Sequence, residues 1–379
     1  MQKILESCYK LLWNENDNAN GWIEPTTRCN LKCPGCYRGA DKDDHIPYTL
    51  SLEEVKSQID WFIENRNIHT LSISGGEPLL YKHINEVVEY ATSKKLRTMI
   101  YTNGLSLTEK KLKELKDAGA TQFLVHADKY QERPDIKDEM TVNDLQQKFC
   151  DLFRKVNGPL LGFIQPLSTN NYIADIERIT NISQKNTDIV SLNVFTLYKD
   201  VCWEPEIKQK ISVSLTMKEV VEAFAENNGF IPATYLPSEF NQFDPTWIFG
   251  TRVGTKNQNF GYFEPKLLKL THEKYRKRTG KHMFISRRNN VKMLGLLKLL
   301  NYKSIRKIWS KYLFSKKSPV YFQTVLLLRG PEKNNEKEWD LCKGCPDRII
   351  YNGRLVPSCI LEDLKNKSNE KFKKVEFKS

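Results

Sequence analysis

Long apolar runs are missing from this chain of 379 residues. No stretch reaches the roughly 18 uncharged apolar residues of a membrane-spanning helix. The first residues also lack the apolar core and the small-residue cleavage site of a secretory signal. We therefore expect a cytoplasmic protein. In a reducing compartment, its nine cysteines are expected to be metal ligands or reactive thiols rather than disulfides.

Acidic residues are almost absent between Pro265 and Lys317. This segment contains 17 Lys and Arg residues and one acidic residue, Glu273, while the net charge of the whole chain is +13. The rest of the chain carries 42 basic and 45 acidic residues and is therefore almost neutral. This distribution excludes a uniformly basic, histone-like protein and sets the basic segment apart from the rest of the fold.

Short apolar or β-branched segments alternate with segments of helical periodicity as far as Glu226. Six strand–helix units in succession predict a parallel α/β sheet, either doubly wound or a partial barrel. In both arrangements, functional residues gather at the C-terminal ends of the strands. The predicted strands are Trp22–Pro25, Thr70–Ser74, Arg97–Thr102, Thr121–His126, Leu160–Gln165 and Ile189–Thr196. The predicted helices are Ser51–Asn65, Tyr81–Lys95, Thr108–Ala118, Val142–Val156, Ile173–Gln184 and Thr216–Glu226.

The expected organisation has five parts. With 40% hydrophobic residues the chain can build a sizeable core, which excludes global disorder. Tyr235–Tyr262 is rich in aromatic residues, proline and glycine, and it is expected to form a folded loop over the mouth of the sheet. The C-terminal tail is polar enough to fray. The parts are an N-terminal segment (1–21), the α/β region (22–229), a basic, aromatic-rich substrate or lid insertion (230–331), a cysteine-bearing region (332–365) and a polar tail (366–379).

Three cysteines, Cys29, Cys33 and Cys36, follow the first predicted strand within eight residues. Three thiolates from one loop can surround one metal centre, and thiolates favour iron–sulfur clusters and zinc. Pro34 and Gly35 allow the loop to turn tightly. Three ligands are one fewer than a closed zinc or cubane site needs, so the site is either completed from elsewhere or left open.

Two further motifs end the next two predicted strands. The second strand runs into Gly75-Gly76-Glu77-Pro78, where two glycines expose backbone groups to a ligand and Glu77 adds an acceptor for a cationic amine. The third strand ends in Tyr101-Thr102-Asn103-Gly104. All of these features are expected to lie on the same edge of the sheet.

In these motifs the sequence resembles the radical S-adenosylmethionine (SAM) superfamily. Cys29, Cys33 and Cys36 match its C-x3-C-x2-C loop, and the segment 75–78 matches its GGEP motif. The resemblance covers about residues 22–200 and implies the α/β fold of that superfamily, a partial (β/α)6 barrel. The resemblance argues against a structural zinc site.

The resemblance also implies roles for these residues. Cys29, Cys33 and Cys36 would hold a [4Fe–4S] cluster whose open iron chelates SAM. Gly75, Gly76, Glu77 and Pro78 would bind the methionyl amine, and Asn103 would lie near the methionyl or ribose group. An electron from the cluster, supplied by a reductant such as flavodoxin or ferredoxin, would cleave SAM to a 5′-deoxyadenosyl radical that abstracts hydrogen from the substrate.

Some positions depart from the family pattern. The aromatic residue usual before the third cysteine is replaced by Gly35, and Tyr37 instead follows Cys36, so the packing of the adenine is left open. The fourth strand ends in His126-Ala127-Asp128 where relatives often read Ser-x-Asp. Asp128 is retained as a cofactor-binding candidate. His126 either contacts SAM or substrate or has a structural role, and Gly162–Gln165 either packs on adenine or is a core strand.

A second cysteine set, Cys342, Cys345 and Cys359, lies near the C-terminus. Asn352-Gly353 between two apolar runs predicts a hairpin that returns Cys359 towards the other two. The spacing resembles the auxiliary cluster of the radical SAM enzyme that acts on GTP in molybdenum-cofactor synthesis, and the shortened "twitch" form of the SPASM domain. It implies a second [4Fe–4S] cluster, with structural zinc as the alternative. Cys202 is a candidate fourth ligand or, like Cys8 and Cys150, a free cysteine.

The basic segment has a helical pattern from Val291 to Phe314, with apolar residues on one face and lysines on another. Three interpretations remain open. It is a lid helix with a solvated basic face, an interfacial helix on anionic lipid, or a counter-charge for a phosphate-bearing or nucleic-acid substrate. His272 and His282 are expected to be packing or solvent-exposed residues rather than ligands.

Together these features predict a radical SAM oxidoreductase, or C–H functionalising enzyme, that acts on an anionic, phosphorylated or lipid-linked substrate. The alternative within enzymes is the maturation of a ribosomally made peptide. An alternative of another class is a non-catalytic metal-cluster protein that binds nucleic acid through the basic segment, and Gly75–Pro78 argues against it. We expect a cytoplasmic location, peripheral at an anionic membrane if residues 291–314 contact lipid.

Overall fold

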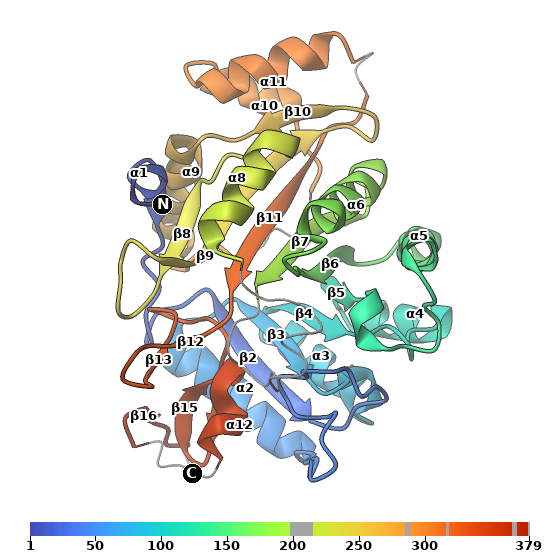
Figure 1. Cartoon of the computed structure of the whole chain (residues 1–379), viewed down its shortest axis with the longest axis vertical. Helices are drawn as coiled ribbons and strands as arrows, with labels where there is room; N and C mark the ends of the chain where they lie inside the picture. Colours follow the sequence, from blue (N-terminus) through green and yellow to red (C-terminus); the bar gives the residue numbers. More distant parts are fainter. Residues whose placement is uncertain (198–214, 285–288, 316–317, 366–369, 378–379) are drawn as a thin grey trace.

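The computed structural model describes residues 1–379 except 198–214, 285–288, 316–317, 366–369 and 378–379. Six parallel strands lie side by side in chain order at its centre (Figure 1). A doubly wound sheet reverses its strand order, so this order is that of a barrel, and the predicted partial (β/α)6 barrel of class α/β is confirmed. The strands are β2 (Asn20–Thr26), β3 (Thr70–Gly75), β4 (Arg97–Thr102), β5 (Gln122–His126), β6 (Leu160–Pro166) and β7 (Val190–Leu197).

Helices follow these strands, and several of them start at a residue whose side chain caps the first turn. Ser51 and Glu54 form a reciprocal capping box at the start of α2, and Thr216 and Glu219 form another at α8. None of the described helices has the length and apolar character needed to cross a membrane. The helices are α2 (Leu52–Arg66), α3 (Ile84–Ser93), α4 (Glu109–Asp117), α5 (Glu139–Val156), α6 (Tyr172–Lys185) and α8 (Met217–Asn228), preceded by a short α1 (Gln2–Leu5).

The sheet continues beyond β7, where the sequence predicted a loop. β11 (Tyr321–Arg329) runs parallel to β7, and β9 (Pro245–Gly254) pairs antiparallel with β11 along eight residues. The expectation of a loop over the mouth at Tyr235–Tyr262 is therefore wrong for most of this segment, because its other aromatic residues pack in strands, while Phe240 and Phe243 lie in the connection between β8 and β9. The remaining strands of this part are β1 (Tyr9–Lys10), β8 (Thr234–Pro237) and β10 (Asn259–Tyr262).

The later part of the basic segment, α10 to α11, forms helices at the opposite end of the sheet from the cysteine loop that follows β2. Asn290 bridges to Tyr321 at the start of β11, and because β11 is parallel to β7 this is the N-terminal edge of the sheet. Figure 1 shows α10 and α11 at the top and the C-terminal hairpin at the bottom. The helices pack on the sheet and expose basic residues, as the lid interpretation expected, but α10 and α11 do not cover the mouth. The helices are α9 (Pro265–Thr279), α10 (Met293–Leu296), η3 (Leu297–Leu299) and α11 (Lys303–Leu313).

The C-terminal region forms the predicted hairpin. Asn352 and Gly353 both adopt positive φ angles, 46° and 66°, between strands that pair antiparallel. Phe372 and Val375 are buried, and the adjacent strand pairs with the hairpin, so the frayed tail was a wrong expectation at these positions. The elements are β12 (Glu332–Lys333), β13 (Trp339–Asp340), β14 (Arg348–Tyr351), β15 (Arg354–Pro357), η4 (Ser358–Ile360), α12 (Leu361–Leu364) and β16 (Lys373–Lys374).

Candidate functional site

The C-terminal ends of the parallel strands and the C-terminal region enclose a cavity of about 290 Å³. Both cysteine sets line it, although they lie more than 300 residues apart in the sequence. Parallel strands explain the convergence, because their carboxyl ends meet at one rim. The sulfur-bearing lining residues are Cys29, Cys33, Cys36, Cys342, Cys345 and Cys359.

The cysteine loop after β2 turns tightly between its second and third cysteines. The Cys36 amide donates to the Cys33 carbonyl at 3.1 Å, while Gly35, at φ 71°, donates its amide to Asp41. Burial raises the pKa of Cys33 to about 12, and the neighbouring cysteines add to this shift. Burial also raises the pKa values of Cys29 and Cys36. A cationic centre would reverse this penalty by favouring the thiolates.

The donor set fits an iron–sulfur cluster. Cys29, Cys33 and Cys36 offer three thiols to one cavity, and thiolates are the ligands that iron–sulfur clusters use.

Gly75 and Gly76 lie directly against the cysteine loop. A Cβ on Gly75 would stand 2.2 Å from the Thr26 carbonyl oxygen, and one on Gly76 would stand 2.4 Å from the carbonyl oxygens of Thr27 and Arg28. The Gly76 amide donates to Thr26 at 3.0 Å. The two glycines are thus required for the close approach of two backbones, and they line the cavity as the sequence predicted.

Glu77 lies behind the cavity wall, where the resemblance had placed it in contact with the cofactor. Its side chain is fully buried, and it accepts hydrogen bonds from the Leu79 amide at 3.0 Å, the Thr102 hydroxyl at 2.8 Å and the Asn103 amide at 2.8 Å. Burial raises the pKa of Glu77. Pro78, the first residue of η1 (Pro78–Leu80), is buried as well. Neither residue lines the cavity, so in this structure they join β3 to β4.

Asn103 and Tyr37 do line the cavity. The Asn103 amide nitrogen lies 3.8 Å from the Cys29 sulfur and donates to Asn30 at 2.7 Å. The Tyr37 hydroxyl lies 3.4 Å from the Ser74 hydroxyl, and burial raises the pKa of Tyr37 well above its ordinary value. Tyr37 is therefore a neutral ring beside the three cysteines, in a position to contact a cofactor.

His126 and Asp128 form a pair at the end of β5. The His126 Nε2 atom lies 2.5 Å from the Asp128 carboxylate, which also accepts the Tyr130 amide at the start of η2 (Lys129–Gln131). Both residues line the cavity, as does Ile164 of β6, whereas Phe163 and Gln165 are buried. The interpretation as a core strand thus holds for Phe163 and Gln165, whereas Ile164 of the same strand faces the cavity.

Arg38 connects the two cysteine sets, and sequence reasoning missed it. It follows Cys36 by two residues, and its side chain is fully buried. It forms an ion pair with Glu24 of β2 at 2.5 Å and approaches Glu362 of α12 at 3.7 Å, three residues after Cys359. Its guanidinium also lies 4.8 Å from the centre of the Tyr37 ring. A basic residue after a cysteine motif carries no signal of such a partner.

The second cysteine set contacts the end of α2 and the segment before β2. Arg66 at the end of α2 donates to the Cys345 carbonyl at 2.9 Å, and Gly344 packs so tightly that a Cβ would stand 2.1 Å from the Trp13 carbonyl oxygen. Hydrogen bonding with Cys342 and burial raise the pKa of Cys345, and burial raises that of Cys359. This set also consists of buried thiols that would gain from a cationic centre.

The wall between the two cysteine sets is mainly apolar, which the sequence did not reveal. Trp22 and Tyr101 pack with ring centres 4.7 Å apart, on adjacent parts of the rim. Residues of β9 and β11, which had been expected to form a loop and a lid, line the opposite side of the cavity. The apolar and aromatic lining residues are Trp22, Tyr101, Ile164, Pro166, Leu167, Val194, Trp247, Leu326, Leu328, Leu341 and Pro357.

The described lining carries more negative than positive charge. Arg329, at the end of β11, is the one Lys or Arg among the lining residues that the structure describes. It is already paired with Asp340 at 2.9 Å, Asp244 at 3.2 Å and Glu332 at 2.7 Å. Carboxylates of Asp128, Asp340 and Asp347 line the same cavity, and burial raises the pKa of Asp347 to about 7.

The other cysteines and histidines lie away from the cavity or outside the described residues. Cys8 and Cys150 are free and do not line the site, and Cys202 falls in the undescribed segment 198–214. All eight described cysteines are free of disulfides. His272 packs edge-on against Tyr9, and His282 lies 3.4 Å from Asp17. Their expected packing roles agree with these contacts.

Comparisons with known proteins match part of the chain to one family. The model of the Radical SAM superfamily matches residues 23–164. The chain is 38% identical over 110 residues to the Fe-coproporphyrin III synthase of Methanosarcina barkeri, and 33% identical over 94 residues to the antilisterial bacteriocin subtilosin biosynthesis protein AlbA of Bacillus subtilis. These matches cover 29% and 25% of this chain but only 27% and 20% of the relatives. Streptococcus suis SuiB bound to S-adenosylmethionine is similar with a TM-score of 0.44 at 15% identity, over 56% of this chain and 47% of that chain.

Proposed function

We propose that this chain cleaves S-adenosylmethionine and removes a hydrogen atom from a substrate held between two iron–sulfur sites. Residues 23–164 match the model of the Radical SAM superfamily, a family of enzymes that use a [4Fe–4S] cluster and S-adenosylmethionine. The observation that carries this proposal is the single cavity lined by both cysteine sets. The non-catalytic, nucleic-acid-binding alternative is not retained, because the matched family consists of enzymes.

Cys29, Cys33 and Cys36 would hold the first cluster. When bound, that cluster supplies the electron that cleaves S-adenosylmethionine to a 5′-deoxyadenosyl radical. The chain itself contributes the surroundings: Gly75 and Gly76 bring the cysteine loop against β3, Asn103 offers an amide beside Cys29, and the Tyr37 ring lines the cavity. The apolar walls exclude water from the reacting groups.

Cys342, Cys345 and Cys359 would hold a second cluster on the other side of the cavity. Their burial, and their position opposite the first set, support a cluster that touches the substrate or relays an electron. Asp347 is a further buried oxygen donor on this side. A fourth ligand from Cys202 remains a proposal, because Cys202 lies outside the described residues.

The substrate class differs from the sequence-based expectation. An anionic, phosphorylated or lipid-linked group was expected because of the basic segment, but α10 and α11 lie at the other end of the sheet. The one described cation in the cavity wall, Arg329, already meets three carboxylates. We therefore propose that the group bound between the cysteine sets is apolar or aromatic and uncharged, in keeping with Trp22, Tyr101 and Trp247.

Peptide maturation is the second candidate. The apolar cavity is suited to a hydrophobic side chain of a peptide, and one relative is a bacteriocin biosynthesis protein. The similarity to that relative covers a quarter of this chain, so it supports the candidate only at the level of the shared domain.

The proposed chemistry needs low-potential electrons. We propose a cytoplasmic reductant such as flavodoxin or ferredoxin, consistent with the free state of the described cysteines. A peripheral membrane position through residues 291–314 is compatible with this proposal, because those residues do not take part in the rim.

The proposed function predicts uncoupled cleavage of the cofactor. Anaerobically reconstituted and dithionite-reduced protein is expected to convert S-adenosylmethionine to 5′-deoxyadenosine, measured by liquid chromatography. Cys33→Ala removes a lining thiol and is expected to lower the rate by at least about 100-fold, since it removes a cluster ligand. Cys150→Ala, a buried cysteine away from the cavity, is the matched control and should keep the rate. Equal rates for the Cys33 variant and wild type would refute the proposal.

A further inference from the structure

Exposed apolar side chains gather on α10, η3 and α11. Thirteen large hydrophobic side chains of the described chain are exposed, and five of them lie within residues 294–314. The most exposed are Phe314 at 87% and Leu294 at 77%. Single exposed hydrophobic residues are ordinary, but a concentration in one short segment marks an interaction surface. The five residues are Leu294, Leu297, Leu300, Leu313 and Phe314.

The opposite side of the same helices is packed into the protein. Ile308 of α11 and Met293 of α10 are buried against Phe260 of β10 and Val253 of β9, and the Lys311 side chain donates to the Asn259 carbonyl at 2.9 Å. The helices thus already have a core of their own. The exposed leucines and Phe314 are therefore a second apolar face, which no described part of this chain covers.

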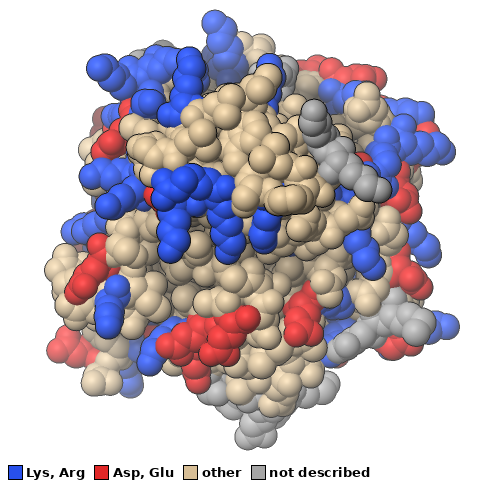
Figure 2. All heavy atoms as spheres, turned by 90° about the horizontal axis from the view of Figure 1, so that it is seen from above, with Lys and Arg blue, Asp and Glu red and all other residues tan. Residues whose placement is uncertain are grey.

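This second face belongs to a segment of positive charge. Residues 289–315 contain six basic residues and no acidic one. Figure 2 looks onto this end of the molecule and shows Lys and Arg side chains bordering a broad uncharged surface. The basic residues are Lys292, Lys298, Lys303, Arg306, Lys307 and Lys311.

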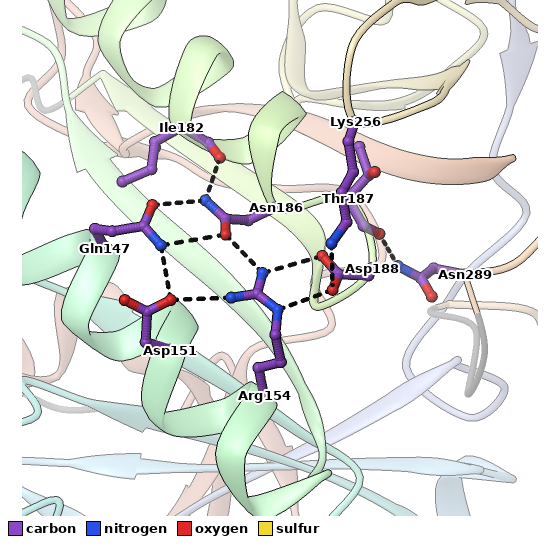
Figure 3. Close-up of polar contacts among 9 residues, drawn as sticks. All are labelled: Gln147, Asp151, Arg154, Ile182, Asn186, Thr187, Asp188, Lys256 and Asn289. Carbon is purple, nitrogen blue, oxygen red and sulfur yellow. Dashed lines mark hydrogen bonds and ion pairs between the residues drawn. The ribbon is translucent and has the colours of Figure 1, made fainter. Parts of the chain in front are cut away.

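A network of polar contacts ties this end of the molecule to the barrel (Figure 3). Arg154 of α5 donates to Asp188 at 3.0 Å, and Lys256, in the turn between β9 and β10, donates to the same carboxylate at 2.9 Å. Asn289 donates to the Thr187 carbonyl, and its own carbonyl accepts the amide of Phe322 at 2.7 Å. Asn289, before α10, and the turn between β9 and β10 are therefore bonded to residues of the barrel. The helices α10 and α11 thus rest on a part of the protein that is fixed to the barrel.

We propose that residues 291–314 are a docking surface for the face of an anionic lipid bilayer. An apolar face rimmed by Lys and Arg is the composition of helices that lie in a membrane interface, with leucine and phenylalanine among the acyl chains and lysine among the headgroups.

Two other occupants fit the same surface less well. A second copy of this chain would bring six basic residues against six more with no acidic residue of this segment between them, which opposes association. A nucleic acid would engage the lysines and could stack one base on Phe314, but it would leave the four exposed leucines in water, since leucine does not offer a ring on which a base can stack.

The position of the docking surface leaves the active-site rim free. The helices lie at the N-terminal edge of the sheet, and the two cysteine sets lie at the other edge. Bound to a bilayer through α10 and α11, the protein would turn its cavity away from the membrane. A soluble reductant and a substrate in the cytoplasm could then reach the cavity.

Vesicle sedimentation of the full-length, reconstituted protein tests this proposal. We expect binding to phosphatidylcholine vesicles that contain phosphatidylglycerol, weaker binding to phosphatidylcholine alone, and a decrease with salt. Leu294→Ser with Phe314→Ser is expected to weaken binding by at least about 10-fold. Lys303→Gln with Lys307→Gln is expected to weaken it by about 25-fold. Because all four side chains are exposed or lie on an exposed helix face, the fold should be retained.

Matched variants away from this surface provide the controls. Leu12→Ser with Ile46→Ser removes two exposed apolar side chains, and Lys82→Gln with Lys110→Gln removes two exposed charges, all outside residues 291–314. These variants should bind vesicles like wild type. Absence of binding, or binding that both surface variants retain, would overturn the proposal. A wild-type dimer that Leu294→Ser with Phe314→Ser converts to a monomer would overturn it in favour of self-association. None of these measurements depends on catalytic activity.

Discussion

Arg38→Met is expected to lower the free energy of unfolding by about 3–5 kcal/mol, because it leaves a buried carboxylate without its cation. Glu24 then keeps one described hydrogen bond, from the Trp22 indole nitrogen at 2.8 Å. Since Arg38 follows Cys36 by two residues and also approaches Glu362, the loss should loosen both cysteine sets. Urea unfolding and the iron content of the reconstituted protein measure the two effects.

Two control variants separate the buried ion pair from charge in general. Glu24→Gln with Arg38→Met removes both charges and should recover a large part of the lost stability, because no unpaired charge remains buried. Lys113→Met breaks a pair with Glu109 on the surface of α4 and should cost less than about 1 kcal/mol. If Arg38→Met costs no more than Lys113→Met, Arg38 does not connect the two sites.

Gly75→Ala is expected to destabilise the protein by about 2–5 kcal/mol and to disturb the cysteine loop. Gly75 has a φ of 118°, and an added Cβ would stand 2.2 Å from the Thr26 carbonyl oxygen, a backbone atom that cannot rotate away. The start of the cysteine loop has to shift, so cluster content should fall together with stability. Thermal unfolding and the iron-to-protein ratio report on both.

Gly229→Ala is the matched control for this substitution. Gly229 also has a positive φ, 65°, but no atom lies within 4 Å of the position of an added Cβ. Gly229→Ala should therefore cost only the backbone strain of a positive φ, about 1–2 kcal/mol, without a steric contact. Gly229 ends α8 and lies far from the cysteine loop in the sequence. A similar loss of iron in both variants would show that the contact with Thr26 is not what holds the loop.

The barrel was predictable from the sequence because local signals and tertiary structure agree there. Each strand from β2 to β7 was placed within two residues, and Ser51, Thr108 and Thr216 cap helices where expected. The strands β8, β9 and β11 were missed. Their partners lie far away in the sequence: β9 pairs with β11 across a stretch of helices, and no short-range pattern encodes that pairing.

The candidate site was predictable where a residue type carries chemistry by itself. The six cysteines and the glycines after β3 line one cavity. Glu77 was placed in contact with the cofactor, yet three donors within the protein occupy its carboxylate. Arg38 and Arg133 could not be found, because their roles depend on the partners that folding brings to them. Arg133 is buried and donates to the carbonyls of Asn103 and His126, which joins the ends of β4 and β5.

The composition of the basic segment did not determine its role. Charge alone left three interpretations of the helices open, and the sheet register adds their position, which for α10 and α11 is the N-terminal edge. This position removes the basic residues of α10 and α11 from the cavity, and with them one reason to expect an anionic substrate. The same position supports a contact with a charged surface outside the barrel.

Iron content and Mössbauer spectra of three proteins test most directly whether two clusters face one cavity. The wild-type protein, reconstituted anaerobically, is expected to hold about eight irons per chain as two cubane clusters. The variant without Cys29, Cys33 and Cys36 and the variant without Cys342, Cys345 and Cys359 are each expected to hold about four. About four irons in the wild type and an unchanged content in the second variant, or zinc in place of iron at the second set, would contradict the account.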